Sequence, residues 1–245
     1  QGPKILLTGR PEERAVGLLA ATQITELFFG DWLVEMPGLC LLAEDMQLPA
    51  ITFAKKNWMH ESGYRALLDI SAEPIRHARF ETLWVVDDRG TNDGREARFC
   101  ELRRRIRGKV ADGTASGRVY LARGNSGQAR HMVNVGAVEA HLEKLGFDTV
   151  HPEQETPEAL ARKLATARTV VTVEGSAQVH ALLAMPERGR LVVLQPPDRF
   201  TAPGKDMADM AGLSYAFMVG DVAEGGFSID LDRLSRTIAL AEETP

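Results

Sequence analysis

Two short loops rich in glycine and arginine are the residues best suited to bind an anion. The segment 123–130 reads Arg-Gly-Asn-Ser-Gly-Gln-Ala-Arg, and the segment 174–176 reads Glu-Gly-Ser. Glycines let backbone amides approach a ligand closely, and the guanidinium groups of Arg123 and Arg130 can each grip two phosphate oxygens. Each loop follows a short apolar run typical of a strand. Because ligands bind at the carboxyl ends of parallel strands, we expect a phosphate site there.

The second loop stands directly before a helix expected over 177–185. The free amides and the dipole at a helix N-terminus attract negative charge, so Gly175 and Ser176 would add to the anion site. His180 lies one helical turn after Ser176 on the same face. Ordinary alternatives remain open: the first loop as a solvated turn, Ser176 as a helix N-cap, and His180 as a structural histidine.

The order of these residues resembles the family 61 glycosyltransferases, a type labelled capsular polysaccharide biosynthesis proteins. The shared pattern is a strand ending in Arg, a second Arg, an Asn before a helix, Gly-Phe, Pro-Glu, another helix and strand, and a helix starting with Gly-Ser. The resemblance covers residues 118–197. The matching residues are Arg123, Arg130, Asn134, Gly146, Phe147, Pro152, Glu153, Ala167, Gly175, Ser176 and His180.

The aromatic segment 28–35 is similar to a family segment with a His-Trp pair and a following Glu. Asp31 stands where the family has the histidine. The resemblance implies that Asp31, or failing that Glu35, deprotonates the acceptor, because a carboxylate can serve as a general base. The exchange could equally mean altered or lost activity. The segment could also be an amphipathic helix with Trp32 in the core and Glu35 in solvent.

The resemblance implies an inverting glycosyltransferase of polysaccharide biosynthesis, which moves a sugar from a nucleotide-sugar donor to a carbohydrate acceptor. It implies two Rossmann-like domains facing a cleft, the GT-B-like architecture, and no metal or other cofactor. The two arginines would neutralise the diphosphate, helped by the amides before the helix. The asparagine and histidine would orient the donor, and the glutamate would bind hydroxyls or hold an arginine. The donor-binding residues implied are Arg123, Arg130, Asn134, Glu174, Gly175, Ser176 and His180.

Two other functions remain open. The chain could be a non-catalytic nucleotide- or sugar-binding protein, with Asp31 marking the absence of transfer chemistry. It could also be a nucleotide-sugar epimerase-like enzyme or act by phosphorolysis, because fold alone does not fix the reaction.

Strands and helices that alternate along the chain must position these residues. Such alternation predicts an α/β fold with parallel sheets. The glycine-rich break 113–117 predicts a boundary between an acceptor-side domain, 1–113, and a nucleotide-sugar-binding domain, 114–245. We expect the last helix to pack back on the first domain. Strands are expected over 4–8, 50–54, 82–86, 119–121, 149–151, 170–173, 191–194 and 214–219, and helices over 22–29, 32–45, 60–70, 93–109, 133–145, 157–167, 177–185 and 231–243.

Composition indicates which partners and which cellular compartment to expect. A net charge of −5 over 245 residues, with both signs mixed, does not indicate a nucleic-acid surface. The basic run 103–109 is interpreted as a solvated helix end. Cys40 and Cys100 have no paired spacing, which favours a reducing compartment and hence the cytoplasm. There is no apolar run of about 20 residues to span a membrane, and the first residues show no signal pattern.

Metal-binding motifs are weak. Asp87 and Asp88 follow an expected strand, as in sites that hold Mg²⁺, but the same sequence is typical of a strand-ending turn. The six histidines have no zinc-ligand spacing. The sequence predicts nothing about the oligomeric state. Because residue 1 is not methionine, residues before it could be missing.

Overall fold

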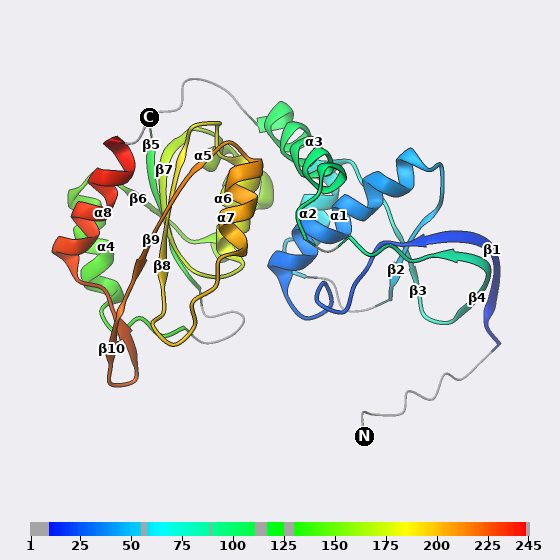
Figure 1. Cartoon of the computed structure of the whole chain (residues 1–245), viewed down its shortest axis with the longest axis horizontal. Helices are drawn as coiled ribbons and strands as arrows, with labels where there is room; N and C mark the ends of the chain where they lie inside the picture. The colour runs from blue at the N-terminus through cyan, green and yellow to red at the C-terminus, as the bar shows by residue number, and fades with distance from the viewer. Residues whose placement is uncertain (1–9, 55–57, 89, 111–116, 125–129, 244–245) are drawn as a thin grey trace.

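The protein alternates strands and helices in a mixed α/β fold. The computed structural model describes residues 10–54, 58–88, 90–110, 117–124 and 130–243. These residues form two parallel sheets, a short hairpin and the helices that cover the sheets (Figure 1). The predicted α/β class with parallel sheets is confirmed. No helix in these ranges is long and apolar enough to cross a membrane.

The first sheet has four parallel strands in the order β3-β2-β1-β4. The strands β2 and β3 are added on one side of β1 and β4 on the other, so the strand order reverses between β1 and β4. Three helices, α1, α2 and α3, lie on the side of this sheet that faces the rest of the molecule (Figure 1). The elements are β1 (Glu12–Leu19), α1 (Phe29–Asp45), β2 (Ala50–Phe53), α2 (Glu61–Leu68), β3 (Glu73–Ile75), β4 (Ala78–Trp84) and α3 (Asp93–Val110).

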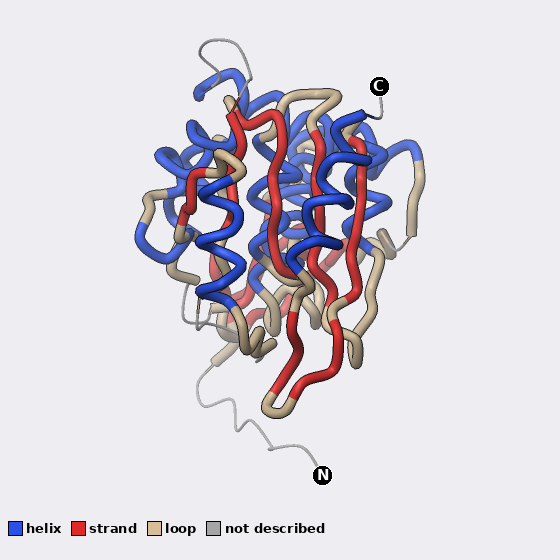
Figure 2. Tube along the Cα trace, turned by 90° about the vertical axis from the view of Figure 1, so that its left-hand side faces the viewer, coloured by secondary structure: helices blue, strands red, loops and turns tan. Residues whose placement is uncertain are grey.

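The second sheet has five parallel strands in the order β6-β5-β7-β8-β9, with the reversal between β5 and β7. Helices α4 and α8 cover one face, and α5, α6 and α7 cover the other (Figure 1). Figure 2 shows the strands side by side, with the hairpin β10–β11 extending beyond them. The elements are β5 (Gly117–Leu121), α4 (Val135–Lys144), β6 (Asp148–Val150), the 3₁₀ helix η1 (Pro152–Gln154), α5 (Pro157–Ala165), β7 (Ala167–Val173), α6 (Ala177–Ala184), β8 (Arg190–Gln195), α7 (Pro203–Met210), β9 (Ser214–Val219), β10 (Asp221–Ala223), β11 (Gly226–Ser228) and α8 (Leu231–Glu243).

Local sequence explains the central elements of the second sheet. Strand β7 reads ARTVVTV, a β-branched run, and it is buried on both faces as expected for a central parallel strand. Helix α5 starts with Pro157, and the hydroxyl of Thr156 accepts a hydrogen bond from the Ala159 amide at 3.2 Å. Proline at the first position and threonine at the cap are standard helix-start signals.

The helices between the two sheets share one hydrophobic core. This core contains Trp32 and Leu33 of α1, Phe99 of α3, and Leu182 and Leu183 of α6, each at most 2 % exposed. Burial of such side chains is the main stabilising term in folding. The two sheets are therefore joined through packed helices rather than by a single linker.

Arginine side chains from the basic run of α3 donate hydrogen bonds to carbonyl groups at the C-terminal ends of neighbouring helices. Arg103 is buried and donates hydrogen bonds to the carbonyls of Leu182 and Met185, the second at 2.8 Å. Arg107 donates to the Ala184 carbonyl at 2.9 Å. These carbonyls end α6 and have no partners within their own helix. The run does end a helix, and Arg104 and Lys109 are exposed, but the interpretation of the whole run as solvated is wrong because Arg103 is buried.

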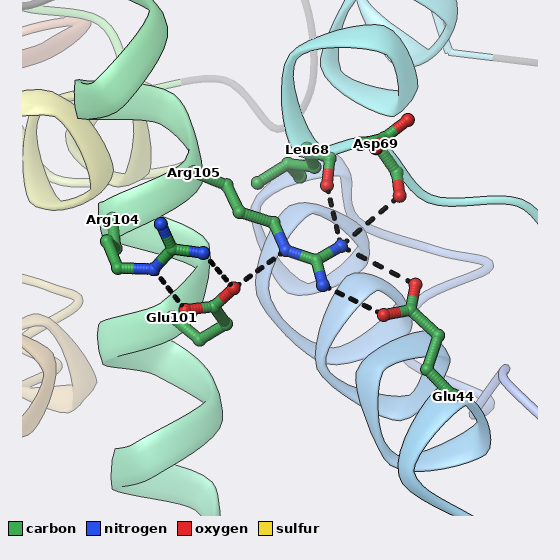
Figure 3. A network of polar contacts seen from close by, with 6 residues as sticks. All are labelled: Glu44, Leu68, Asp69, Glu101, Arg104 and Arg105. Carbon is green, nitrogen blue, oxygen red and sulfur yellow. Dashed lines mark hydrogen bonds and ion pairs between the residues drawn. The ribbon is translucent and has the colours of Figure 1, made fainter. Parts of the chain in front are cut away.

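Arg105 makes the corresponding contacts with α2 and α1 (Figure 3). Its guanidinium donates to the Leu68 and Asp69 carbonyls at the end of α2 and pairs with Glu44 of α1 at 2.8 Å. Glu101 accepts hydrogen bonds from both Arg104 and Arg105, which lowers the pKa of this carboxyl to about 2. Arginine side chains on two sides of α3 thus contact three helices.

Several expected elements differ from the structure. The segment 22–28 is not helical, because Thr22 and Thr25 hydrogen-bond to each other and form a local turn. Strand β1 was not expected, since it begins with the charged residues Glu12 to Arg14. The strand expected over 4–8 lies outside the described residues, as do positions 111–116, where the predicted boundary falls.

The final helix does not pack on the first sheet. It lies beside α4 on the five-stranded sheet, where Leu234 and Ile238 enter the core of that face. Glu242 pairs with Arg118 of β5 at 2.6 Å, and Arg190 of β8 donates to the Ala241 carbonyl at 2.9 Å. These contacts correct the expected position of 231–243.

Candidate functional site

The carboxyl ends of both sheets open onto one cavity, which we call the first cavity. Its volume is about 390 Å³. Residues that follow β4, β5, β7 and β8 line it together with the start of α1, which follows β1. In open α/β sheets, ligands bind at the topological switch point, the crevice at the carboxyl ends of the strands where the strand order reverses. The polar residues among its lining are Asp31, Glu35, Thr91, Arg95, Arg130, Glu174, Ser176, Gln178, Arg199, Thr201 and Asp206.

The N-termini of α1 and α6 meet at this cavity. The amide of Gly30 donates a hydrogen bond to the Ser176 hydroxyl at 3.1 Å. Ser176 occupies the N-cap position of α6, but its side chain accepts no hydrogen bond from α6. A Cβ on Gly30 would lie 3.1 Å from the Ser176 Cα, so glycine permits this close approach. Two helix dipoles therefore point their positive ends at one place.

Gly175 allows Arg123 to lie over the second loop. Its φ of +136° is a conformation that favours glycine, and a Cβ there would come within 2.4 Å of Arg123 Nη1. Arg123 Nη1 donates to the Glu174 carbonyl at 3.2 Å. Burial lowers the pKa of Arg123, and the neighbouring Arg130 lowers it further. The second effect shows that two positive charges lie close together here.

Glu174 holds Arg130 inside the protein. Their side chains form an ion pair and are only 7 % and 8 % exposed. The Thr201 hydroxyl donates to Glu174 Oε1 at 3.1 Å. A buried pair of this kind needs further hydrogen bonds to offset its desolvation, and Thr201 supplies one. Of the two roles expected for Glu174, the structure thus places it in contact with an arginine. The residues 125–129 of the first loop lie outside the described residues.

The two candidate bases lie on one face of α1. Asp31 and Glu35 are one helical turn apart and both line the first cavity. Burial raises the pKa of Asp31, and the Glu35 carboxylate raises it further, whereas Arg95 lowers it. Glu35 accepts a hydrogen bond from the Thr22 hydroxyl at 2.9 Å and lies 3.6 Å from Arg95. Glu35 is therefore held by partners rather than simply solvated.

A second cavity, of about 420 Å³, shares Phe28, Arg130 and Ser176 with the first. Aromatic rings form one part of its wall, and charged side chains another. The other residues that line it are Leu27, Phe29, Trp58, Met59, His60, Ala122, Arg123, Gly124, Pro152, Glu153, Ala177 and His180.

His180 lines the second cavity rather than the first. Its ring stacks on Tyr64, and its Nδ1 lies 2.6 Å from the Tyr64 hydroxyl. Burial lowers the pKa of His180 to about 3, and His60 lowers it further, so the imidazole is neutral near pH 7. The ring is both buried in the helix core and adjacent to a cavity.

Asn134 hydrogen-bonds to the backbone of the segment before α8. Its amide nitrogen donates to the Ile229 carbonyl at 2.8 Å, and its amide oxygen accepts from the Ile229 amide at 3.0 Å. It is absent from the described lining of either cavity. The structure thus gives Asn134 a role in fixing the segment before α8, which differs from the donor contact expected for it.

Sequence reasoning missed several residues of the site. Arg95 lies in the first turn of α3 after β4, Arg199 follows β8, and Trp58 precedes α2. The position of Arg95 and Arg199 after strand ends is a signal that could have identified them. Asp88, considered for a metal, pairs with Arg98 at 2.6 Å and accepts from Arg95 through its carbonyl.

Comparison with known proteins finds one matching family. Residues 29–192 match the family model described as Glycosyltransferase 61, which is well over half of the chain. The match runs from the first residue of α1 into β8 and so contains both carboxylates and both loops. A search of curated proteins found no match.

Proposed function

Because the chain belongs to glycosyltransferase family 61, we propose that it transfers a sugar from a nucleotide-sugar donor to a carbohydrate acceptor with inversion at the anomeric carbon. Family membership makes the chain an enzyme of the glycosyltransferase class. The donor class, the inversion and a role in polysaccharide biosynthesis are our proposal. The observation that supports it most is that Asp31 lines the same cavity as Arg130, Gly175 and Ser176.

The donor diphosphate would bind at Arg123, Arg130 and the N-termini of α1 and α6. In the reaction the bond between the anomeric carbon and the diphosphate breaks, and the leaving group departs with the electron pair. Fixed positive charge at that position stabilises the transition state more than the bound donor. Two arginines and two helix dipoles provide this charge, so we propose transfer without a metal.

Asp31 would accept the proton from the acceptor hydroxyl as its oxygen attacks the anomeric carbon. Inversion requires this attack from the side opposite the diphosphate. Asp31 comes from the helix that follows β1, whereas the arginines and Ser176 come from the second sheet. The raised pKa of Asp31 makes it a stronger base than an ordinary aspartate.

The topological switch points of the two sheets, between β1 and β4 and between β5 and β7, both face the first cavity. This supports a GT-B-like arrangement. In this proposal, residues 1–113 form the acceptor side and residues 114–245 the donor side. The shared helix core between the sheets would keep the two sides at a fixed distance during the reaction.

Product analysis tests the proposal. Purified protein is incubated with a panel of nucleotide sugars and oligosaccharide acceptors, and nucleoside diphosphate release and the anomeric configuration of the product are measured by NMR. We expect an inverted glycoside from wild type and a loss of roughly 10²-fold or more in kcat for Asp31→Asn. Nucleoside diphosphate affinity should stay unchanged in this variant.

Two outcomes would contradict the proposal. If nucleotide sugars bind but no sugar is transferred to any acceptor or to water, the chain would instead be the non-catalytic binding protein. Conversion of the donor to an isomer would favour the epimerase-like enzyme. Arg162→Ala, a half-exposed arginine paired with Glu158 on α5, is the surface control and should behave as wild type.

A further inference from the structure

We infer that the second cavity takes the nucleoside of the donor, with its planar base against the aromatic side chains, while the transferred sugar lies in the first cavity. This inference rests on the proposed function and assigns the two ends of the donor to two different spaces.

The residues shared by the two cavities carry the first step. Arg130 and Ser176 line both, so a diphosphate bound to them has one cavity on each side. A nucleotide-sugar has a diphosphate in its middle, with a nucleoside at one end and a sugar at the other. The nucleoside, diphosphate and sugar thus follow the same order as one cavity, the residues Arg130 and Ser176, and the other cavity.

The position of Asp31 decides which end goes where. Asp31 and Glu35 line the first cavity and are absent from the described lining of the second. The acceptor hydroxyl and the anomeric carbon must both lie near the base, so the sugar belongs in the first cavity. The nucleoside is then left with the second.

Arg123 and Arg130 line the end of the second cavity where the diphosphate would bind, whereas its aromatic residues suit a base. Trp58 and Phe29 meet edge to face with ring centroids 6.2 Å apart, and Phe28 lines the same space. Aromatic side chains stack on every nucleobase. Burial lowers the pKa of His60 and of His180, so these rings are neutral near pH 7 and add no positive charge.

The cavity is accessible and has polar groups to orient a nucleoside. Leu27 and Met59 line it and are 58 % and 65 % exposed, so it opens to solvent. Glu153 lies against Gly124, where a Cβ would come within 2.1 Å of its carboxyl carbon. A carboxylate there repels a phosphate but can accept hydrogen bonds from ribose hydroxyls or a base amino group. A volume of about 420 Å³ lies within the usual range of small-molecule sites.

The test separates base binding from diphosphate binding. Dissociation constants for inorganic pyrophosphate and for UDP, GDP, ADP and CDP are measured by calorimetry in EDTA, on the whole chain. Wild type should bind at least one nucleoside diphosphate more than about ten-fold tighter than pyrophosphate, as stacking on one base supplies. Trp58→Ala should abolish this preference and leave pyrophosphate binding within about two-fold, while Trp58→Phe should restore most of it.

A second variant keeps the test decisive if Trp58→Ala does not fold. Met59→Ala removes an exposed side chain and should lower the same preference several-fold. An unchanged preference in both Met59→Ala and Trp58→Ala overturns the inference, and if Trp58→Ala does not fold, an unchanged preference in Met59→Ala overturns it. Wild type that binds pyrophosphate and nucleoside diphosphates equally also overturns it, but leaves the proposed function standing. Wild type that binds neither overturns both.

Discussion

At the residue scale, the site is defined by charges that control one another. Asp31 lies near a carboxylate, Glu35, that raises its pKa and near an arginine, Arg95, that lowers it. Arg95 also contacts Glu35 at 3.6 Å and donates to the Asp88 carbonyl at 2.7 Å, so it is fixed in place. Burial and Glu35 thus raise the basicity of the candidate base, and Arg95, which sequence reasoning did not identify, opposes them.

Removing this arginine should shift the pH dependence of transfer. Its positive charge favours the ionised form of Asp31, so Arg95→Leu raises the pKa of Asp31 above its already raised value. Because the base must be ionised to act, the acid limb of kcat/KM should move to higher pH. The profile is measured between about pH 4 and 9 on wild type, Arg95→Leu and the surface control Arg162→Ala. An acid limb that does not move, or that moves to lower pH, contradicts the assignment of Asp31.

At the scale of elements, strand order explains which residues could be found from sequence. Arg123, Glu174, Gly175 and Ser176 follow β5 and β7, which are neighbours in the sheet, so local patterns predicted their meeting. Asn134 could not be placed, because its partner Ile229 is 95 residues away. The second cavity could not be predicted either, since Trp58 and His60 reach it only through the packing of α1 and α2 against the second sheet's helices.

Helix α3 offers a stability test at this scale. Arg103 and Arg104 are sequence neighbours, yet Arg103 is buried against the end of α6, whereas the Arg104 side chain is 73 % exposed. Arg103→Met leaves the Leu182 and Met185 carbonyls without the arginine donors, so it should lower the free energy of unfolding by about 3 kcal/mol. Arg104→Ala should change it by less than about 0.5 kcal/mol. Urea unfolding measures both, and equal losses would show that α3 does not hold α6.

At the scale of the whole molecule, two parallel sheets meet through their helices and present their carboxyl ends to a common cavity. The shared core, from Trp32 to Leu183, makes this a pre-formed site rather than one assembled from two loose parts. The Gly30 to Ser176 hydrogen bond crosses the same junction. A donor bound at the second sheet and a base carried by the helix after β1 would therefore already be held next to each other before the substrates bind.

The measurement that tests this account most directly is the affinity of nucleoside diphosphates in EDTA for wild type, Arg130→Ala and Arg162→Ala. Arg130 lines both cavities and is nearly buried, so loss of its charge-assisted hydrogen bonds to the diphosphate should cost about 2 kcal/mol, or roughly 30-fold in Kd. The account predicts metal-independent binding that Arg130→Ala weakens to this extent while Arg162→Ala leaves it unchanged. Equal affinities in all three proteins would contradict it.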